Sequence, residues 1–203
     1  MPAFNTAGMF NYTPASGTVL NAGINQVLSA NFVPSNTNNF NSVNGVTVLI
    51  TVNKANPVIT WNNPAAINYG TSLSTAQLNA TANVPGSFTY TPASGTMLNA
   101  GANQKLAVRF VPTNTGNYTI VEETAVTITV NKINVTARAN SMSRIYGLDN
   151  PVLTISFTGF VNGETESVLD SKPTASTTAA KTTSVGTYPI PVSGGLDNNY
   201  NFI

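Results

Sequence analysis

The chain contains no cysteine and no histidine. The absence of cysteine excludes disulfides, thiolate metal sites and a thiol nucleophile. The absence of histidine removes the commonest general base and the commonest metal ligand. We therefore expect a protein that is not an enzyme, with no catalytic, cofactor-binding or metal-binding residues.

Charged residues are also scarce. They make up 7% of the 203 residues, and the formal net charge is +1. Because no run of Lys or Arg offers a positive patch for phosphates, we expect no nucleic-acid partner. No apolar run reaches the roughly 18 residues that cross a bilayer, so we expect no direct membrane insertion. Met1–Phe10 lacks the basic and apolar regions of an export signal, which would then lie on another part of an exported parent protein.

What the sequence does contain is an internal repeat. Tyr12–Thr18 recurs as Tyr90–Thr96, and Leu20–Gly23 recurs as Leu98–Gly101, both at an offset of 78 residues. The same offset relates Phe32–Pro34 to Phe110–Pro112 and Val52–Lys54 to Val130–Lys132. A constant offset without gaps indicates a duplicated module.

Apolar and polar residues alternate along the expected strands. In Lys105–Phe110 and Ala125–Val130 the alternate residues form an apolar set, with the period of a half-buried β-strand. The residues expected to face inward are Leu106, Val108, Phe110, Val126, Ile128 and Val130, with Leu28, Ala30 and Phe32 in the first copy. Turn residues separate such strands about every ten residues, which favours an antiparallel sandwich or barrel. Of the two we predict the sandwich, in an all-β fold of immunoglobulin-like antiparallel β-sandwich modules.

The repeat divides the chain into three modules. We expect residues 1–54 to be an immunoglobulin-like module truncated at its N-terminus, residues 55–132 a complete one, and residues 133–203 a different β-sandwich module truncated at its C-terminus. No Gly-, Ser- or Pro-rich linker separates them, because the next expected strand begins soon after Lys54 and Lys132. Short junctions leave little freedom, so we expect an extended rod in which each module contacts its neighbours in the same chain.

Lys54 and Lys132 each close a module. We interpret both as surface lysines whose aliphatic stems pack on the module while the ammonium group reaches solvent. An intramolecular isopeptide bond, formed by a buried lysine beside Asn and Glu, is the alternative.

Several segments of the first two modules occur together in one known class of protein. They are Pro57–Trp61, Ile67–Gly70, Thr91–Gly95 and Phe110–Tyr118. With these segments the chain resembles the immunoglobulin-like repeats of long bacterial exoproteins. The resemblance implies a β-sandwich repeat within a very large extracellular protein.

The C-terminal module carries a different set of spaced segments. They are Ile145–Leu148, Asn150–Pro151, Gly159–Gly163, Val185–Pro189, Ser193–Gly195 and Asn199–Tyr200. This set resembles the MBG repeat of the Tyr-Gly-X type, so we expect the module at residues 133–203 to be MBG-like. Such repeats occur in very large secreted or cell-surface proteins, including adhesins and, in Bacteroidota, proteins exported by the type IX route. The resemblance implies an extracellular location at a bacterial cell surface.

The repeat, the missing linkers and the resemblance together predict a mechanical function. We expect a structural spacer, a stalk segment of a large bacterial cell-surface adhesin that presents a distal binding region. The alternative is that the modules themselves are the adhesive surface and bind surface glycans or other cells. Trp61 or Tyr118 exposed in a concave patch would favour that alternative.

Trp61 and Tyr118 are the candidate ligand contacts. Trp61, the only Trp, ends an apolar strand, where it either packs in the core or at a module junction, or stacks on a ligand. Tyr118 closes Asn114–Tyr118, which resembles the tyrosine corner of immunoglobulin domains, in which the Tyr hydroxyl bonds upstream backbone. Stacking on a sugar is its alternative role. The first copy has Phe40 at this position.

The acidic residues are few and scattered. Calcium is the one cofactor left open, because Asp149–Asn150 and Asp197–Asn199 offer side-chain oxygens. Calcium takes six to eight oxygen ligands, and no Asp-rich loop supplies them, so we prefer to interpret both segments as turns. A glycosidase would need two carboxylates held at a set spacing in a cleft, which a small sandwich with few acids rarely forms.

Overall fold

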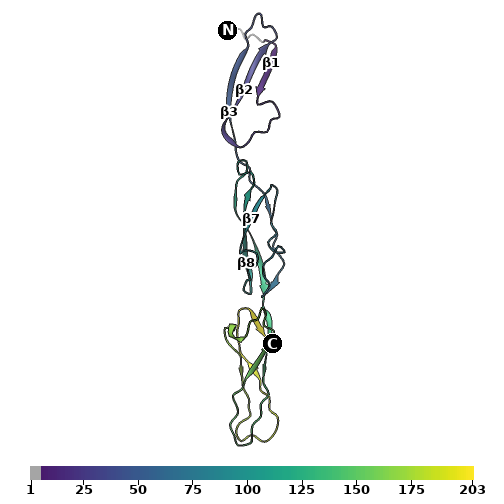
Figure 1. Ribbon diagram of the computed structural model, residues 1–203, viewed down its shortest axis with the longest axis vertical. Helices are drawn as coiled ribbons and strands as arrows, with labels where there is room; N and C mark the ends of the chain where they lie inside the picture. The colour runs from purple at the N-terminus through teal and green to yellow at the C-terminus, as the bar shows by residue number, and fades with distance from the viewer. Residues whose placement is uncertain (1–5) are drawn as a thin grey trace. The chain divides into compact units, whose positions relative to one another are not determined.

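The computed structural model describes residues 6–203, and β-strands make up nearly all of its regular structure (Figure 1). One 3-10 helix, η1 (Glu166–Val168), is the only helical element in the described part of the chain. No helix among these residues is long and apolar enough to cross a membrane. The predicted all-β class is confirmed.

Contacts divide the chain into two compact units. The first comprises Met1–Thr60, Thr81–Phe88 and Arg109–Glu123, and the second comprises Trp61–Ala80, Thr89–Val108 and Thr124–Ile203. Three strands contribute residues to both units: β7 (Gly86–Thr91), β8 (Gly101–Pro112) and β9 (Val121–Asn131). The module boundaries after Lys54 and Lys132 stay predictions.

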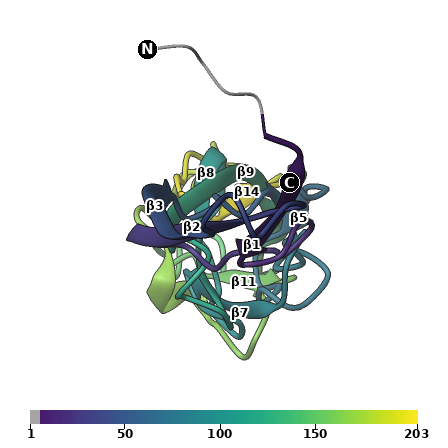
Figure 2. The same ribbon diagram turned by 90° about the horizontal axis from the view of Figure 1, so that it is seen from above.

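The first unit contains an antiparallel sheet of three strands. They are β1 (Gly8–Thr13), β2 (Gly23–Pro34) and β3 (Val43–Val52), with β2 between its two partners (Figure 2). The unit also contains the antiparallel pair β4 (Ile59–Thr60) and β6 (Thr81–Ala82). The rings of Phe10 and Phe32 lie 4.9 Å apart between centroids, and their copies Phe88 and Phe110 lie 4.8 Å apart. The duplication therefore extends to side-chain packing.

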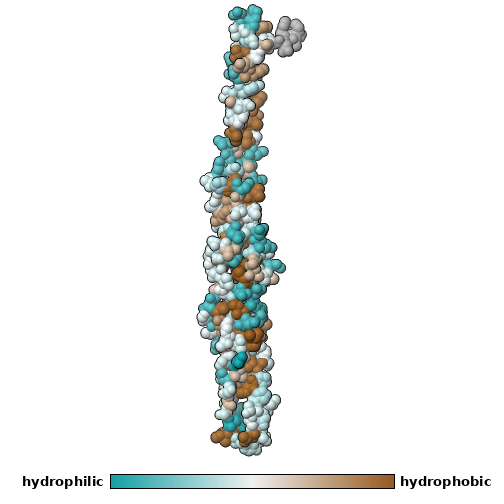
Figure 3. Space-filling view, turned by 90° about the vertical axis from the view of Figure 1, so that its right-hand side faces the viewer, coloured by the Kyte–Doolittle hydropathy of each residue, from teal (hydrophilic) through white to brown (hydrophobic). Residues whose placement is uncertain are grey.

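One apolar face of the β1–β2–β3 sheet is largely open among the described residues. Val48 and Ile50 are 61% and 39% exposed, whereas their copies Val126 and Ile128 are 7% and 2% exposed. Apolar side chains are visible on the surface of this part of the chain (Figure 3). The residues expected to face inward in the first copy, Leu28, Ala30 and Phe32, are only half-buried. An alternating strand buries its apolar side only where a second layer covers it.

In the second unit a covering segment is present over the equivalent strands. Its sheet has the order β5–β9–β8–β7, with β5 (Ile67–Asn68) parallel to β9. Leu73 and Leu78 form a buried cluster with residues of β8 and β9: Leu106, Val126 and Ile128. All six residues expected to face inward from β8 and β9 are buried, so that prediction is confirmed.

Residues 133–203 add a second sheet to this unit. Its central strand β10 (Ile133–Ala139) runs antiparallel to β11 (Ile155–Thr158) and parallel to β14 (Tyr200–Phe202). A separate antiparallel pair joins β12 (Thr174–Ala175) and β13 (Val192–Ser193). Val135 and Tyr200 are buried, and the Tyr200 ring meets Phe160 edge-on at 5.1 Å between centroids. The core of this segment is therefore built around Tyr200.

Candidate functional site: the module junctions

Trp61 is half-buried and packs against the core cluster of the second unit. Its indole N–H donates to the Gln77 carbonyl at 3.0 Å, and its ring meets Tyr90 edge-on at 5.4 Å between centroids. With its polar atom bonded and its ring packed, Trp61 contributes to the core of its module. Its role as a ligand contact stays a prediction.

Tyr118 is half-buried and follows a tight turn. The amides of Asn117 and Tyr118 donate to the Asn114 carbonyl at 3.3 and 3.1 Å. In the first copy, the Phe40 amide donates to the Asn36 carbonyl at 3.2 Å in the same way. The Tyr118 hydroxyl makes no hydrogen bond to another of residues 6–203, so this corner depends on Asn114 rather than on the tyrosine. Whether Tyr118 contacts a ligand stays a prediction.

The acidic residues do not converge on one place. Within residues 6–203 no three acidic side chains lie together as a metal site would require. Arg109 donates to Glu122 at 2.7 Å, which lowers the pKa of the Glu122 carboxyl, and Lys181 lies 3.5 Å from Asp149. Asp197 is 4% exposed, and its carboxylate accepts three backbone amides. The two aspartates considered for calcium therefore already have protein partners.

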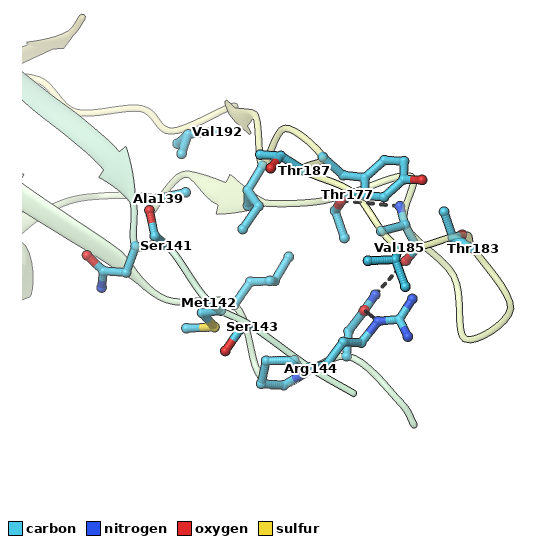
Figure 4. Close-up of a pocket in the computed structure, with 18 of the residues that line it drawn as sticks. Ala139, Ser141, Met142, Ser143, Arg144, Thr177, Thr183, Val185, Thr187 and Val192 are labelled. Atoms are coloured by element: carbon cyan, nitrogen blue, oxygen red, sulfur yellow. Dashed lines mark hydrogen bonds between the residues drawn. The ribbon is translucent and has the colours of Figure 1, made fainter. Parts of the chain in front are cut away.

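An open cavity of about 850 Å³ lies in the C-terminal segment. Its lining mixes apolar and polar side chains, among them Met142, Val185 and Tyr188; the first two are seen with Arg144 in Figure 4. Arg144 donates to Asn150 Oδ1 at 2.7 Å and to backbone carbonyls of the neighbouring loops. Arg144 thus ties together the loops that surround the cavity.

Among the described residues, three hydrogen bonds join the first repeat to the second, and a fourth lies beside them within the second repeat; all four are inside the first unit. Asn117 Oδ1 accepts from the Ala22 amide at 2.7 Å, and Asn117 Nδ2 donates to Asn21 Oδ1 at 2.9 Å. Lys54 Nζ donates to the Thr115 carbonyl at 2.6 Å. The amide of the next residue, the first of the second repeat, donates to the Asn117 carbonyl at 2.9 Å.

The junction between the second repeat and the C-terminal segment lies inside the second unit. Asn199 Oδ1 accepts from the Ala100 amide at 2.8 Å, and Asn199 Nδ2 donates to Asn99 Oδ1 at 3.4 Å. Lys132 Nζ donates to the Asp197 carbonyl at 2.7 Å. The amide that follows Lys132 donates to the Asn199 carbonyl at 3.0 Å. The four bonds repeat those of the first junction, donor for donor.

The orientation of the two asparagine amides follows from their partners. A backbone amide can only donate, so the side-chain oxygen of Asn117 must face Ala22, and that of Asn199 must face Ala100. The side-chain nitrogen is then left to donate to the neighbouring asparagine oxygen. Each junction therefore uses both halves of one carboxamide group.

The second junction carries an additional cluster. The Tyr69 hydroxyl donates to Glu164 Oε1 at 2.8 Å, and the Tyr200 hydroxyl donates to Oε2 of the same carboxylate. The two rings meet edge-on at 5.5 Å between centroids. Desolvation by burial, followed by the bond to Glu164, raises the pKa of each tyrosine to about 12. Both hydroxyls therefore stay protonated donors far above neutral pH.

Sequence reasoning did not identify these junction residues. It treated Lys54 and Lys132 as surface lysines, and both are exposed, but it did not foresee that each donates to a carbonyl of the following module. A signal was present in the Asn-Tyr pair shared by Asn117–Tyr118 and Asn199–Tyr200. The pair also occurs at Asn11–Tyr12 and Asn68–Tyr69, so this signal alone would not have singled out Asn117 and Asn199.

Comparison with known proteins bears on the C-terminal segment. No curated protein and no solved structure matches the chain. Residues 133–203, about a third of the chain, match the family model of the MBG domain (YGX type). The resemblance predicted for this segment is therefore confirmed, and residues 133–203 are similar to the MBG domain of the YGX type.

Proposed function

We propose that this chain is a structural spacer, a stalk segment of a large bacterial cell-surface adhesin that presents a distal binding region. The observation that carries the proposal is the pair of matching junctions, each with three hydrogen bonds between modules and a fourth beside them, without an intervening linker. Joined modules of this kind are suited to maintaining a set spacing. The similarity of residues 133–203 to the MBG domain supports a repeat module of a large surface protein.

The proposal includes an extended rod of immunoglobulin-like modules. Adjacent modules linked by a flexible tether would move independently, whereas bonded junctions restrict that motion. The rod would act outside a bacterial cell, after export by the type IX route. Its partners would be the neighbouring modules, and it would need no enzymatic activity, cofactor, nucleic acid or membrane insertion.

Distances between spin labels test the spacer directly. Because the chain has no cysteine, single cysteines can be placed at Ala15 and Ala93, equivalent exposed positions in the two repeats. Double electron–electron resonance should give a narrow distance distribution for the labelled chain. Asn117→Ala should broaden it, because the substitution removes two of the three hydrogen bonds between the repeats.

Asn39→Ala is the matched control for this measurement. Asn39 occupies the equivalent turn position in the first repeat, and its side chain makes no hydrogen bond to another of residues 6–203. The distance distribution of this variant should keep its original width. A broad distribution in the labelled chain without any junction substitution would contradict the spacer.

The cavity in the C-terminal segment favours a second function, in which the modules themselves bind glycans. An open pocket lined by Tyr188, by neutral polar groups and by Arg138 and Arg144 could hold an uncharged sugar against an aromatic ring. A glycan array probed with the whole chain, with and without calcium, tests this function. Saturable binding that is lost in Tyr188→Ala, Trp61→Ala or Tyr118→Ala would support it. Absence of binding would leave the spacer as the better account.

A further inference from the structure

At both junctions the residues of the preceding module are the same, whereas the loops of the following modules differ in sequence. We call Asn21, Ala22 and Lys54 the first socket, and Asn99, Ala100 and Lys132 the second socket. The loops that they hold, residues 115–118 and 197–200, are the first and second plugs. The sockets are copies of one sequence, whereas the plugs read Thr-Gly-Asn-Tyr and Asp-Asn-Asn-Tyr and belong to modules of different type.

Different local turns support the two plugs. In the first plug, Asn114 Oδ1 accepts from the Asn117 amide at 3.1 Å. In the second, Asp197 Oδ1 accepts from the amides of Asn199 and Tyr200 at 2.7 and 2.9 Å. Both turns nevertheless place an asparagine carboxamide between the same two socket groups. The socket contacts, and not the turn, are what the two plugs have in common.

The chemistry of the socket accounts for asparagine at this position. The socket presents a backbone N–H that needs a hydrogen-bond acceptor and an asparagine side-chain oxygen that needs a hydrogen-bond donor. A carboxamide does both at once, whereas an aspartate side chain only accepts. The lysine of the socket binds a main-chain carbonyl, which a residue of any type supplies. Recognition therefore requires one side chain of the plug.

We infer that the socket is a general connector for any following module whose plug presents an asparagine carboxamide and, two residues earlier, a main-chain carbonyl. The inference rests on the proposed spacer function and adds which kind of following module the socket of each repeat binds. An immunoglobulin-like repeat and an MBG-like module meet the same requirement, so modules of either type can follow one repeat directly.

Amide hydrogen exchange of the full chain, followed by NMR, tests the role of the plug asparagine. Asn117→Ala should accelerate exchange of the Ala22 amide about tenfold, as loss of one hydrogen bond of ordinary net strength would, and leave Ala100 unchanged. Asn199→Ala should do the reverse. An Ala22 or Ala100 amide that keeps its protection in the respective variant would overturn the inference.

Exchanging the plug sequence tests its generality. Thr115→Asp with Gly116→Asn gives the first plug the sequence of the second at two exposed positions and keeps Asn117. In this double variant the Ala22 amide should exchange as slowly as it does in a control double variant, Thr115→Ala with Gly116→Ala, which also replaces the glycine. Faster exchange in the exchanged plug than in this control would show that the socket depends on the plug type. That result would leave the narrow spin-label distribution, and with it the spacer, untouched.

Discussion

Replacing Leu106 by alanine is expected to destabilise the second unit by about 2–5 kcal/mol, because Leu106 is fully buried in its core cluster. Its copy Leu28 is only half-buried, on the sheet face that the described residues leave open. Leu28→Ala should therefore cost about 1 kcal/mol or less, since less apolar area is lost from the interior. The two leucines have the same place in the repeat and differ in what covers them.

Trp61 makes this comparison measurable. It is the only tryptophan and packs against the same cluster as Leu106, so its fluorescence reports unfolding of that core. In urea, Leu106→Ala should lower the midpoint of the Trp61 transition. Leu28→Ala should leave that midpoint in place, because Leu28 belongs to the other unit. Equal shifts for the two variants would contradict the difference in burial.

Replacing Glu164 by alanine is expected to destabilise the second unit by about 2–4 kcal/mol, because two tyrosine hydroxyls lose their carboxylate acceptor. Tyr200 is 2% exposed, so its hydroxyl cannot turn to bulk water instead. Glu164→Gln keeps one acceptor oxygen of the same size and should cost less. Urea unfolding followed by circular dichroism compares the two variants. A cost for glutamine equal to that for alanine would show that the carboxylate is not the acceptor that matters.

The same cluster predicts a loss of stability at alkaline pH. Burial and the bond to Glu164 raise the pKa of Tyr69 and Tyr200 to about 12, above the ordinary value of 10.0. A raised pKa in the folded state means that the contribution to stability is complete below pH 10 and is lost as the pH rises through about 12. We expect the free energy of unfolding to fall across this window. In the double variant Tyr69→Phe with Tyr200→Phe, the free energy of unfolding should decrease less over this pH range. An equal decrease in that variant would show that other groups cause the loss of stability.

The core of the second repeat could be predicted from sequence because strand burial follows a local pattern. Alternation along Lys105–Phe110 and Ala125–Val130 placed the buried residues correctly. The same pattern in the first copy, at Leu28 and Phe32, corresponds to side chains that are only half-buried. Alternation determines which side of a strand is apolar, and the presence of a covering segment such as Leu73–Leu78 determines whether that side is buried.

The sequence by itself determined the duplication, the all-β class and the similarity of residues 133–203 to the MBG domain, because these properties reside in residue order and spacing. Only the tertiary structure identified Asn117 and Asn199 as junction residues. Their socket partners lie 95 to 100 positions away along the chain, and no local period relates them. A carboxamide becomes specific only when a donor and an acceptor stand on either side of it, and folding brings those two groups together.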